Sequence, residues 1–509
     1  MMSMISLLLS LLAAQPAAAA PCDLYASQGT PCVAAHSTTR ALYSSYTGPL
    51  YQVVRASDGL TVDIPPLTTP GPARGIANSA VQDAFCTHTT CLISIIYDQS
   101  GKGNDLRRGP GGAFDGPEAD HSDHLASANG APVTLNGHRV YGVFISPGTG
   151  YRIDNAKDIA IGDQPEGMYA VLDGTHYNDV CCFDYGNAET SNTDTGAGHM
   201  EAIYYGSNTF WGSGAGNGPW IMADLEDGLF SGYGPKVNTG DPSLSYRFVT
   251  AVTKGRQGYW SIRGGDSQST AKLSTYYSGP RPSGDGYDPM NKEGAIVLGI
   301  GGDNSNGGQG TFYEGVMTNG YPSDAADDAV QADIAAAKYA TTSPNDGPAL
   351  TVGASISFRP TAKCCTTRYL IHEGSENSGG SISFMDLSTY NQEPLKWQAR
   401  WTVRAGLANS ACYSFESFDT PGSFLRHLEY RVVLGPNDGS KDFVEDATFC
   451  TSAGLNGQGN SIRSWNFPTR LWRLYFDGLF VGSNGGVFGF DSQAEYNDDA
   501  SWAIVEAYT

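Results

Sequence analysis

The chain is short of charged residues and especially of cations. Only 16% of its 509 residues are charged, and 30 lysines and arginines stand against 52 aspartates and glutamates, a formal net charge of −22. Nucleic acids and anionic membranes are bound through clustered lysine and arginine, so this balance argues against both as partners. It is typical of a soluble secreted protein.

Four sequence signatures are also missing. Beyond residue 20, no stretch is long and apolar enough to span a bilayer. The cysteines lack zinc-site spacing, and residues 299–301 lack the helix and third glycine of a dinucleotide-binding loop. No Asn-X-Ser/Thr sequon occurs. We therefore expect no membrane anchor, no metal and no cofactor.

The first residues resemble a secretory signal. The apolar core, 5–14, is too short for a membrane anchor, and the small residues 17–20 follow it near a cleavage point. We predict a signal peptide over residues 1–20 and an extracellular protein. Ten cysteines in an exported chain should form disulfides. Two adjacent pairs, 181–182 and 364–365, could each bond to each other or pair elsewhere.

Residues 60–320 alternate short apolar runs with clusters of Gly, Asn, Asp and Ser. With 64 glycines and 28 tyrosines in the chain, this pattern predicts an all-β fold, here a β-sandwich. A helix-like run covers 34–46, and a second helix is predicted from Ser323 as N-cap to about Tyr339. The expected strands include 89–97, 139–145, 168–172, 248–253 and 258–263.

Residues 341–348 have the composition of a linker, Thr-Thr-Ser-Pro-Asn-Asp-Gly-Pro, and predict a domain boundary. Three weakly similar units of about fifty residues follow it, and such a repeat predicts a threefold β-trefoil. The predicted domains are therefore 21–340 and 349–509. Each unit has an opening strand (355–358, 414–417, 461–465), a basic-aromatic strand (368–372, 424–427, 471–474) and a closing tetrad (398–401, 446–449, 499–502).

Two windows carry acids in positions suited to catalysis. The run 218–230 contains Asp224 and Glu226, which on a β-strand would share one face and raise each other's pKa. The alternative is a solvated turn, because Glu-Asp-Gly is good turn chemistry. A predicted buried strand, 293–300, runs into a glycine-rich loop that holds Asp303. Glycoside hydrolysis needs two such carboxylates flanking a bond.

With these residues, the chain resembles the fungal family 54 α-L-arabinofuranosidases that carry a family 42 carbohydrate-binding module. The resemblance covers nearly the whole chain after the signal and is carried by motifs at 178–186, 220–230 and 301–310. It implies a concanavalin-like catalytic β-sandwich, a β-trefoil arabinose-binding domain, a retaining mechanism and no cofactor.

The resemblance also implies residue roles. Glu226 would be the nucleophile and Asp303 the general acid/base. Asp227 and Gly228 stand where the family usually has asparagine. The implied substrate-binding residues are Asp224, Asp227, Gly228, Gly302, Trp211, Cys181 and Cys182. The implied disulfides are Cys22–Cys32, Cys86–Cys91, Cys181–Cys182 and Cys412–Cys450, which leaves Cys364 to pair with Cys365.

In the C-terminal domain, family sites use a histidine on the middle strand and an aspartate in the closing tetrad. The second repeat has both, His427 and Asp446, with Glu429 and Tyr430 nearby. We expect one sugar site there. The alternative is that His427 only satisfies a structural hydrogen bond.

The other two repeats depart from this pattern. The first keeps His372 but has Gln398 in place of the aspartate, so no site is expected there. The third keeps Asp499 but has Leu474 in place of the histidine. Asp499 and Leu479 are the candidate contacts of this weaker third site.

The expected function is a secreted, monomeric, exo-acting α-L-arabinofuranosidase. It would remove terminal non-reducing α-L-arabinofuranosyl residues from arabinoxylan, arabinan and related hemicellulose or pectin side chains. The alternatives are a non-catalytic arabinose-binding lectin and a different glycosidase, such as a β-xylosidase or endo-glucanase. A calcium loop is a further alternative, since Asp303, Ser305, Gly308 and Glu314 mimic EF-hand positions, but strands rather than helices flank it.

Overall fold

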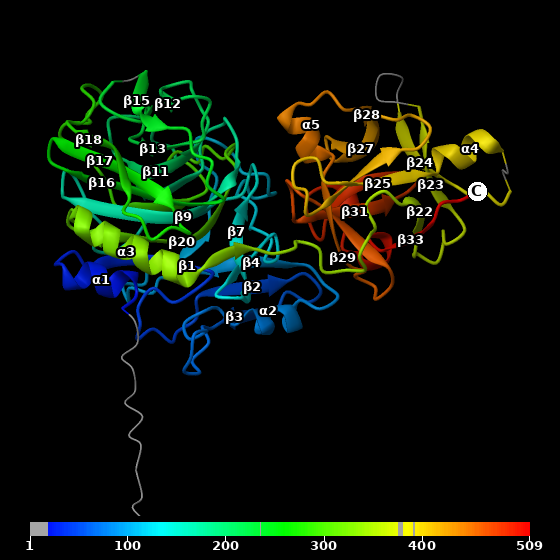
Figure 1. Cartoon of the computed structure of the whole chain (residues 1–509), viewed down its shortest axis with the longest axis horizontal. Helices are drawn as coiled ribbons and strands as arrows, with labels where there is room; N and C mark the ends of the chain where they lie inside the picture. Colours follow the sequence, from blue (N-terminus) through cyan, green and yellow to red (C-terminus); the bar gives the residue numbers. More distant parts are fainter. Residues whose placement is uncertain (1–18, 235, 375–379, 390–391) are drawn as a thin grey trace, which may run out of the picture.

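The computed structural model describes residues 19–234, 236–374, 380–389 and 392–509. The predicted signal peptide lies outside these ranges except for residues 19 and 20. Within them, no helix is long and apolar enough to cross a membrane. The prediction of a mostly β chain is confirmed, and the strands form an N-terminal and a C-terminal part (Figure 1).

One N-terminal sheet has nine strands. They are β1 (Cys32–Ser37), β6 (Ala131–Leu135), β7 (His138–Ile145), β9 (Glu166–Tyr177), β16 (Phe248–Arg256), β17 (Tyr259–Asp266), β18 (Ser274–Gly279), β20 (Gly310–Asn319) and β21 (Tyr339–Thr341). Their order is β18-β17-β16-β9-β20-β7-β6-β21, with β1 also paired to β20. The strand β21 extends one residue into the predicted linker.

The second N-terminal sheet has ten strands. They are β2 (Tyr51–Arg55), β3 (Thr61–Ile64), β4 (Cys91–Ile96), β5 (Leu106–Arg108), β8 (Tyr151–Ile153), β10 (Asp184–Ala188), β11 (Glu201–Gly206), β13 (Trp220–Asp224), β14 (Leu229–Phe230) and β19 (Ala295–Leu298). Their order is β14-β13-β11-β10-β19-β8-β5-β4-β2-β3. Two further strands, β12 (Ser213–Ala215) and β15 (Val237–Pro242), form a small parallel pair.

The two large sheets pack against each other around one apolar core. Strand β11 contacts β9 and β16, and β13 contacts β16 and β17. Because side chains alternate along a strand, Ile221 and Ala223 of β13 enter this core, whereas Trp220 and Met222 belong to a separate cluster on the other face. Asp224 shares that outer face, where the site described below is built.

The helices of the N-terminal part are α1 (Pro21–Ser27), α2 (Ser79–Phe85) and α3 (Asp324–Ala337). The prediction of a helix capped by Ser323 is confirmed, because its hydroxyl accepts the Ala326 N–H at 3.1 Å. The predicted helix over 34–46 is wrong. Ala34 lies in β1, which is buried along its whole length and paired with β20, so tertiary pairing outweighs the helix preference of alanine.

Three units build the C-terminal part. The first holds β22 (Ser355–Pro360), β23 (Tyr369–Glu373), β24 (Ser381–Met385), α4 (Glu393–Gln398) and β25 (Trp401–Ala405). The second holds β26 (Tyr413–Ser417), β27 (Ser423–Leu428), β28 (Arg431–Pro436), α5 (Lys441–Asp446) and β29 (Phe449–Ala453). The third holds β30 (Asn460–Ser464), β31 (Arg470–Tyr475), β32 (Gly478–Ser483), a short 3-10 turn η2 (Gly489–Asp491), α6 (Tyr496–Asp499) and β33 (Trp502–Glu506).

The units share one order of elements, which is three strands, a short helix and a strand. The opening strands β22, β26 and β30 begin at or next to the serine-rich runs that the sequence marked as unit starts. Nine strands close into a ring in the order β28-β27-β26-β25-β22-β33-β30-β31-β32, because β32 pairs back to β28. The main apolar core of this part draws buried side chains from all three units, and smaller apolar clusters lie apart from it.

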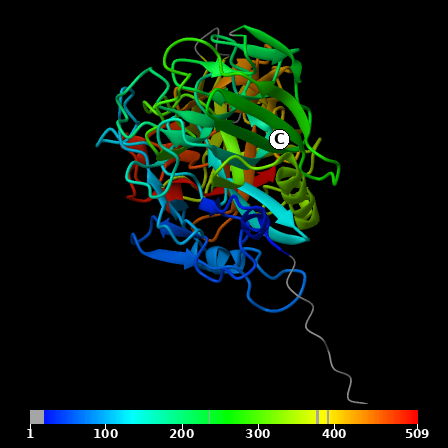
Figure 2. The same ribbon diagram turned by 90° about the vertical axis from the view of Figure 1, so that its left-hand side faces the viewer.

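The C-terminal part contacts the N-terminal part through polar side chains. The Ser146 hydroxyl donates to the Asn466 carbonyl at 2.6 Å, and Gln309 Nε2 donates to both Glu445 carboxylate oxygens at 3.2 Å. In the turned view of Figure 2, much of the C-terminal part lies behind the N-terminal sheets. These contacts join the two parts beyond the chain connection itself.

All ten cysteines are described, and none is free. The bonded pairs are Cys22–Cys32, Cys86–Cys91, Cys181–Cys182, Cys364–Cys365 and Cys412–Cys450.

Candidate active site

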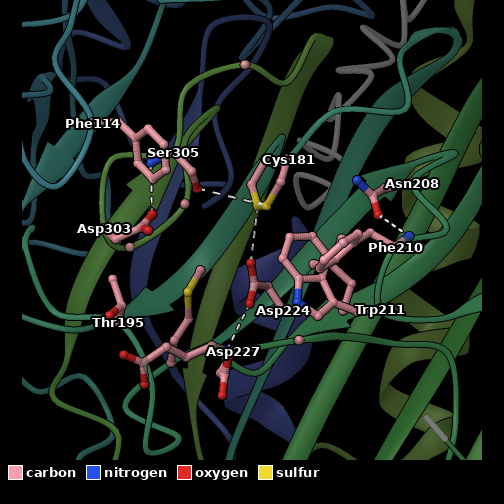
Figure 3. A pocket seen from close by; sticks show the side chains of 18 of the residues that line it. Phe114, Cys181, Thr195, Asn208, Phe210, Trp211, Asp224, Asp227, Asp303 and Ser305 are labelled. Atoms are coloured by element: carbon pink, nitrogen blue, oxygen red, sulfur yellow. Dashed lines mark hydrogen bonds between the residues drawn. A yellow bond between two sulfur atoms is a disulfide. The ribbon is translucent and has the colours of Figure 1, made fainter. Parts of the chain in front are cut away.

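A pocket with a volume of about 680 Å³ opens on the outer face of the ten-stranded sheet. Figure 3 shows Asp224 beside Cys181 in this pocket, with Asp303 on another side. The pocket gathers every residue that the resemblance implied for catalysis or substrate binding: Asp224, Glu226, Asp227, Gly228, Gly302, Asp303, Trp211, Cys181 and Cys182.

Glu226 enters the pocket from a turn. Asp224 ends β13, and the next acids, Glu226 and Asp227, have positive φ values of 59° and 44°. The Glu226 N–H donates to Asp224 Oδ1 at 2.8 Å. The prediction that both acids share a strand face is therefore wrong, and the turn interpretation describes the backbone. A left-handed φ is unusual for residues other than glycine, and here Glu226 and Asp227 both adopt it. The turn places the carboxyl groups of these two residues in one pocket.

The Glu226 carboxylate is held by two backbone donors. Gly196 N–H donates to Oε1 and His199 N–H to Oε2, both at 2.6 Å. The side chain is only 6% exposed, and burial raises its pKa while the two hydrogen bonds oppose the rise. The Tyr287 hydroxyl donates to the Glu226 carbonyl at 2.6 Å and fixes the turn.

His199 also places its ring beside Glu226. Its Nδ1 lies 2.6 Å from Asp194 Oδ2, 3.9 Å from Glu226 Oε2 and 3.8 Å from Glu293 Oε1. Burial opposes protonation of the ring, but the Asp194 hydrogen bond and the charges of Glu226 and Asp194 outweigh it and raise the pKa of His199. Asp194, His199 and Glu293 are close enough to share a metal ion, and ion pairing already accounts for their arrangement.

Asp303 lies in the glycine-rich loop after β19. Its Oδ1 accepts the Ser305 N–H at 2.9 Å. Behind it, Asn304 Nδ2 donates to the Phe114 carbonyl at 2.9 Å and contacts Asp123 Oδ1 at 3.4 Å. Burial raises the pKa of Asp123 to about 7. The loop is therefore anchored from behind, and the half-buried Asp303 faces the pocket.

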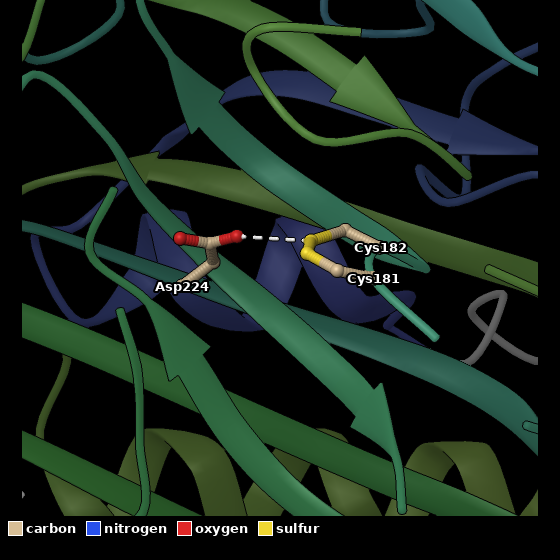
Figure 4. Close-up of side chains that lie close together, drawn as sticks. All are labelled: Cys181, Cys182 and Asp224. Carbon is tan, nitrogen blue, oxygen red and sulfur yellow. Dashed lines mark hydrogen bonds between the residues drawn. A yellow bond between two sulfur atoms is a disulfide. The ribbon is translucent and has the colours of Figure 1, made fainter. Parts of the chain in front are cut away.

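A vicinal disulfide and an indole supply the apolar walls. The Cys182 sulfur lies 3.4 Å from Asp224 Oδ2 (Figure 4). Because the sulfurs of Cys181 and Cys182 are bonded to each other, neither offers a thiolate, and these residues do not make a metal site with Asp224. Trp211 is half-buried, and its ring centroid is 4.9 Å from that of Phe210.

Sequence reasoning missed two buried acids at the two ends of β10. Burial and the neighbouring Asp224 raise the pKa of Asp184 well above its usual value, and burial raises that of Asp224 to about 7. Neither carboxyl oxygen of Asp184 has a hydrogen-bond partner among the described residues. The other missed acid, Glu189, lines the pocket directly. Asp184 falls inside the motif 178–186, whereas no sequence signal pointed to Glu189.

The calcium alternative for the Asp303 loop is wrong. Glu314, which would close an EF-hand loop, lies fully buried in β20, where Arg40 Nε donates to it at 2.6 Å. Its carboxylate is therefore committed to a structural ion pair.

In the second C-terminal unit, the predicted histidine and aspartate meet. His427 Nε2 lies 3.2 Å from Asp446 Oδ1 and 2.9 Å from Asn466 Oδ1. Arg426 Nη2 donates to Asp446 Oδ2 at 2.7 Å. Burial lowers the pKa of His427. The contact with Asn466 matches the alternative interpretation, in which His427 satisfies a structural hydrogen bond.

The other candidates of this part differ in their placement. Glu429 and Tyr430 form the turn between β27 and β28, with φ values of 47° and 66°. Asp499 accepts from Arg473 Nη2 at 3.2 Å. The prediction for Leu479 is wrong, because its side chain is fully buried in the core, opposite Leu474 in the β31–β32 pair, and cannot reach a sugar. In the first unit, His372 Nε2 lies 2.7 Å from Asp419 Oδ1.

A pocket with one carboxylate fixed in a strained turn and a second carboxyl group in a glycine-rich loop defines the class of protein, a glycoside hydrolase. The α-L-arabinofuranosidase B catalytic family matches residues 21–340, and the α-L-arabinofuranosidase B (ABFB) domain family matches residues 358–504. The chain belongs to this family, glycoside hydrolase family 54, with a C-terminal carbohydrate-binding module of family 42.

Individual relatives agree. The chain is 65% identical to the probable α-L-arabinofuranosidase B of Aspergillus clavatus, over 97% of this chain and 95% of the relative. It is 64% identical to the "Arabinofuranosidase/B-xylosidase" of Trichoderma koningii, over 96% of this chain and 95% of the relative. A solved arabinofuranosidase complexed with arabinofuranosyl-α-1,2-xylobiose superposes with a TM-score of 0.93 at 59% identity, over 96% of this chain and 99% of that one.

Proposed function

We propose that this α-L-arabinofuranosidase is exo-acting and retaining, and that it releases terminal non-reducing α-L-arabinofuranosyl residues with Glu226 as nucleophile and Asp303 as general acid/base. The observation that carries the proposal is that Glu226, Asp303 and Asp224 line one pocket. The activity itself follows from the family.

In the first step, Glu226 attacks the anomeric carbon while the bond to the leaving oxygen breaks. Asp303 gives its proton to that oxygen, and an ester forms between the sugar and Glu226. In the second step, water attacks the anomeric carbon, its proton passes to Asp303, and Glu226 leaves as a carboxylate. The backbone donors of Gly196 and His199 hold the Glu226 carboxylate in one orientation for both steps.

The remaining pocket residues bind the sugar. Asp224 accepts hydrogen bonds from ring hydroxyls, while Asp227, Gly228 and Gly302 border the same space. The disulfide ridge and Trp211 give two apolar walls for a small furanose ring. Apolar walls on two sides of the carboxylates favour an exo-acting enzyme on one terminal furanose over an endo-acting enzyme with a long open cleft.

We further propose that residues 21–340 form a concanavalin-like β-sandwich and residues 349–509 a β-trefoil, joined by the linker 341–348. The packing of two large sheets and the three units with one element order support this assignment. The signal peptide over residues 1–20, secretion and a monomeric state complete the proposal, supported by the apolar leader, the disulfides and the acidic composition.

The proposed substrates are arabinoxylan, arabinan and related side-chain arabinosides of plant cell walls. The relative solved with arabinofuranosyl-α-1,2-xylobiose supports a xylan-linked arabinose. The His427–Asp446 pair, with Glu429 and Tyr430, is the proposed sugar site of the module, and Asp499 belongs to a weaker third-repeat site. The named activity of the Trichoderma koningii relative favours β-xyloside hydrolysis as a second candidate activity.

The test is release of 4-nitrophenol from 4-nitrophenyl α-L-arabinofuranoside by the wild type, Glu226→Ala and Asp303→Ala. Turnover by the wild type and loss of most of it in both variants supports the assigned pair. Azide should then rescue the two variants with opposite anomeric products. A silent wild type that still binds arabinoxylan would favour the lectin alternative. Turnover of the corresponding 4-nitrophenyl β-xyloside, measured in parallel, tests for the second candidate activity.

A further inference from the structure

Glu189 is a pocket-lining acid without a role in the steps above. It follows β10 directly, is 1% exposed and lines the same pocket as Glu226 and Asp303. No other described residue donates a hydrogen bond to either of its carboxyl oxygens. Buried polar atoms are nearly always paired, so an unpaired carboxyl group at an active site calls for a functional explanation.

The carboxyl group of Glu189 occupies the space that glycine leaves at position 302. A Cβ atom on Gly302 would collide with the carboxyl carbon and both carboxyl oxygens of Glu189. Gly302 does not have a left-handed φ, so its glycine is explained by this close approach and not by backbone conformation. The residue in contact with Glu189 is thus the immediate neighbour of Asp303.

Arg152 of β8 ties the two segments together. Its buried guanidinium donates through Nη1 to the Gly302 carbonyl and through Nη2 to the Glu189 carbonyl. These bonds fix the backbone on both sides of the contact. They also direct the guanidinium to carbonyl oxygens, so the Glu189 carboxyl group gains no direct hydrogen bond from it.

We propose that Glu189 is a positioning residue of the glycosidase site, whose carboxyl group packs against Gly302 and so holds the adjacent Asp303 in place for proton transfer. This inference rests on the proposed role of Asp303. Glu189 acts through the Gly302–Asp303 backbone, and no contact with the sugar is required.

The carboxyl group does this work in its neutral form. The charged or titratable groups that interact with it are Glu226, Arg152, Asp224 and Asp184. Burial raises the pKa of Glu189 to about 9, with Glu226 and Asp224 adding to the rise and Arg152 opposing it. At neutral pH, Glu189 therefore adds no negative charge to the pocket. Ionisation at alkaline pH would add that charge.

The first experiment compares Glu189→Gln and Glu189→Ala in kcat, KM and pH profile with 4-nitrophenyl α-L-arabinofuranoside. Glutamine keeps the shape and the neutral charge, so we expect kcat within about 2-fold of the wild type and an unchanged pH profile near neutral pH. Alanine leaves the loop unsupported, so kcat should fall roughly 10- to 100-fold, with KM changed less than about 3-fold.

Glu201→Gln is the matched control. Glu201 is a fully buried acid outside the pocket, bound by Arg281 and Lys292. This variant should melt earlier than the wild type while the folded enzyme keeps its kcat and pH profile. It separates a loss of stability from a loss of positioning.

The second experiment is a double-mutant cycle with Gly302→Ala. In the wild type the added methyl group collides with Glu189, whereas in Glu189→Ala it finds room. The double variant should therefore lose less activity and melting temperature than the sum of the two single effects.

Three results would overturn the proposal: wild-type kcat in Glu189→Ala, a glutamine variant as slow as the alanine variant, or additive effects in the cycle. If Asp303→Ala also keeps its rate, the proposed function has failed. If Asp303→Ala is inactive and the Glu189 variants are unaffected, only the present inference has failed.

Discussion

The pocket and the second-repeat site of the C-terminal part both hold carboxylates close to a histidine, but they neutralise them differently. In the pocket, no described lysine or arginine forms an ion pair with Glu189, Asp224, Glu226 or Asp303. In the second repeat, Arg426 binds Asp446 at 2.7 Å. Crowded acids that have no lysine or arginine partner hold and exchange protons, whereas an acid bound to guanidinium remains a fixed acceptor.

The pKa values follow this difference. Burial raises the pKa of Asp224 to about 7 and that of Glu189 to about 9, which places protons inside the pocket at neutral pH. Proton exchange is what glycosidic bond cleavage needs, and it is of no use to a binding site. The same contrast separates hydrolysis from polymer binding, so substitutions should affect one without the other.

The largest effect is expected from Glu226→Gln. Removing the nucleophile should lower kcat by more than about 10⁴-fold, because the covalent step has no replacement. Binding to insoluble arabinoxylan should stay near the wild-type level, since the second-repeat site is untouched. Turnover of 4-nitrophenyl α-L-arabinofuranoside and a pull-down on the polymer measure the two properties. A parallel loss of polymer binding would show that the pocket supplies the affinity.

The converse substitution is His427→Ala. It removes the ring that contacts Asp446, so polymer affinity should fall roughly 10- to 100-fold. Turnover of the small aryl substrate should remain within about 2-fold. Asp499→Asn in the third repeat is the control, because that repeat lacks the histidine and should contribute less. An equal loss in the control would mean that both repeats bind sugar.

The parts of the fold set by local pattern could be predicted from the sequence. The cap at Ser323, the β7 run and the three opening strands of the C-terminal units depend on neighbouring residues and periodicity. The structure of residues 34–46 could not be predicted in this way, because strand β1 is fixed by its pairing with β20, which lies far along the chain.

The same division holds for the candidate sites. Glu226 and Asp303 lie in motifs that carried the family resemblance. Glu189 gains its place from contact with Gly302, and Leu479 is turned inward by the β31–β32 pairing. Neither fact can be found within a local stretch of sequence.

A smaller effect, on melting temperature, is expected when aspartate is replaced by asparagine at Asp184 or at Asp446. The pKa of Asp184 is raised on folding by burial and by Asp224, so folding takes up a proton between its unfolded and folded pKa values, and stability falls as pH rises through that window. Asparagine cannot ionise, so the melting temperature of Asp184→Asn should rise relative to that of the wild type as pH increases above about 4.

At the second-repeat site the exchange should act in the opposite direction. Asp446→Asn weakens the ion pair with Arg426 and should lower the melting temperature by about 1–3 °C near neutral pH. Calorimetry of Asp184→Asn and Asp446→Asn, from about pH 4 to neutral pH, measures the change in melting temperature of each variant. Equal signs at the two positions would contradict the claim that the sites neutralise their acids differently.

The smallest effects concern the two histidines. Although burial opposes it, the Asp194 hydrogen bond and the charge of Glu226 raise the pKa of His199, whereas burial lowers that of His427. The stability from protonated His199 is complete below about pH 6.5 and is lost as pH rises through the folded pKa. For His427 the wild type instead loses stability as pH falls below about 6.5, since only the unfolded chain takes up the proton. His199→Gln should therefore be most destabilising in acid, and His427→Gln least so. Opposite slopes of the melting-temperature difference against pH would support the contrast, and parallel slopes would contradict it.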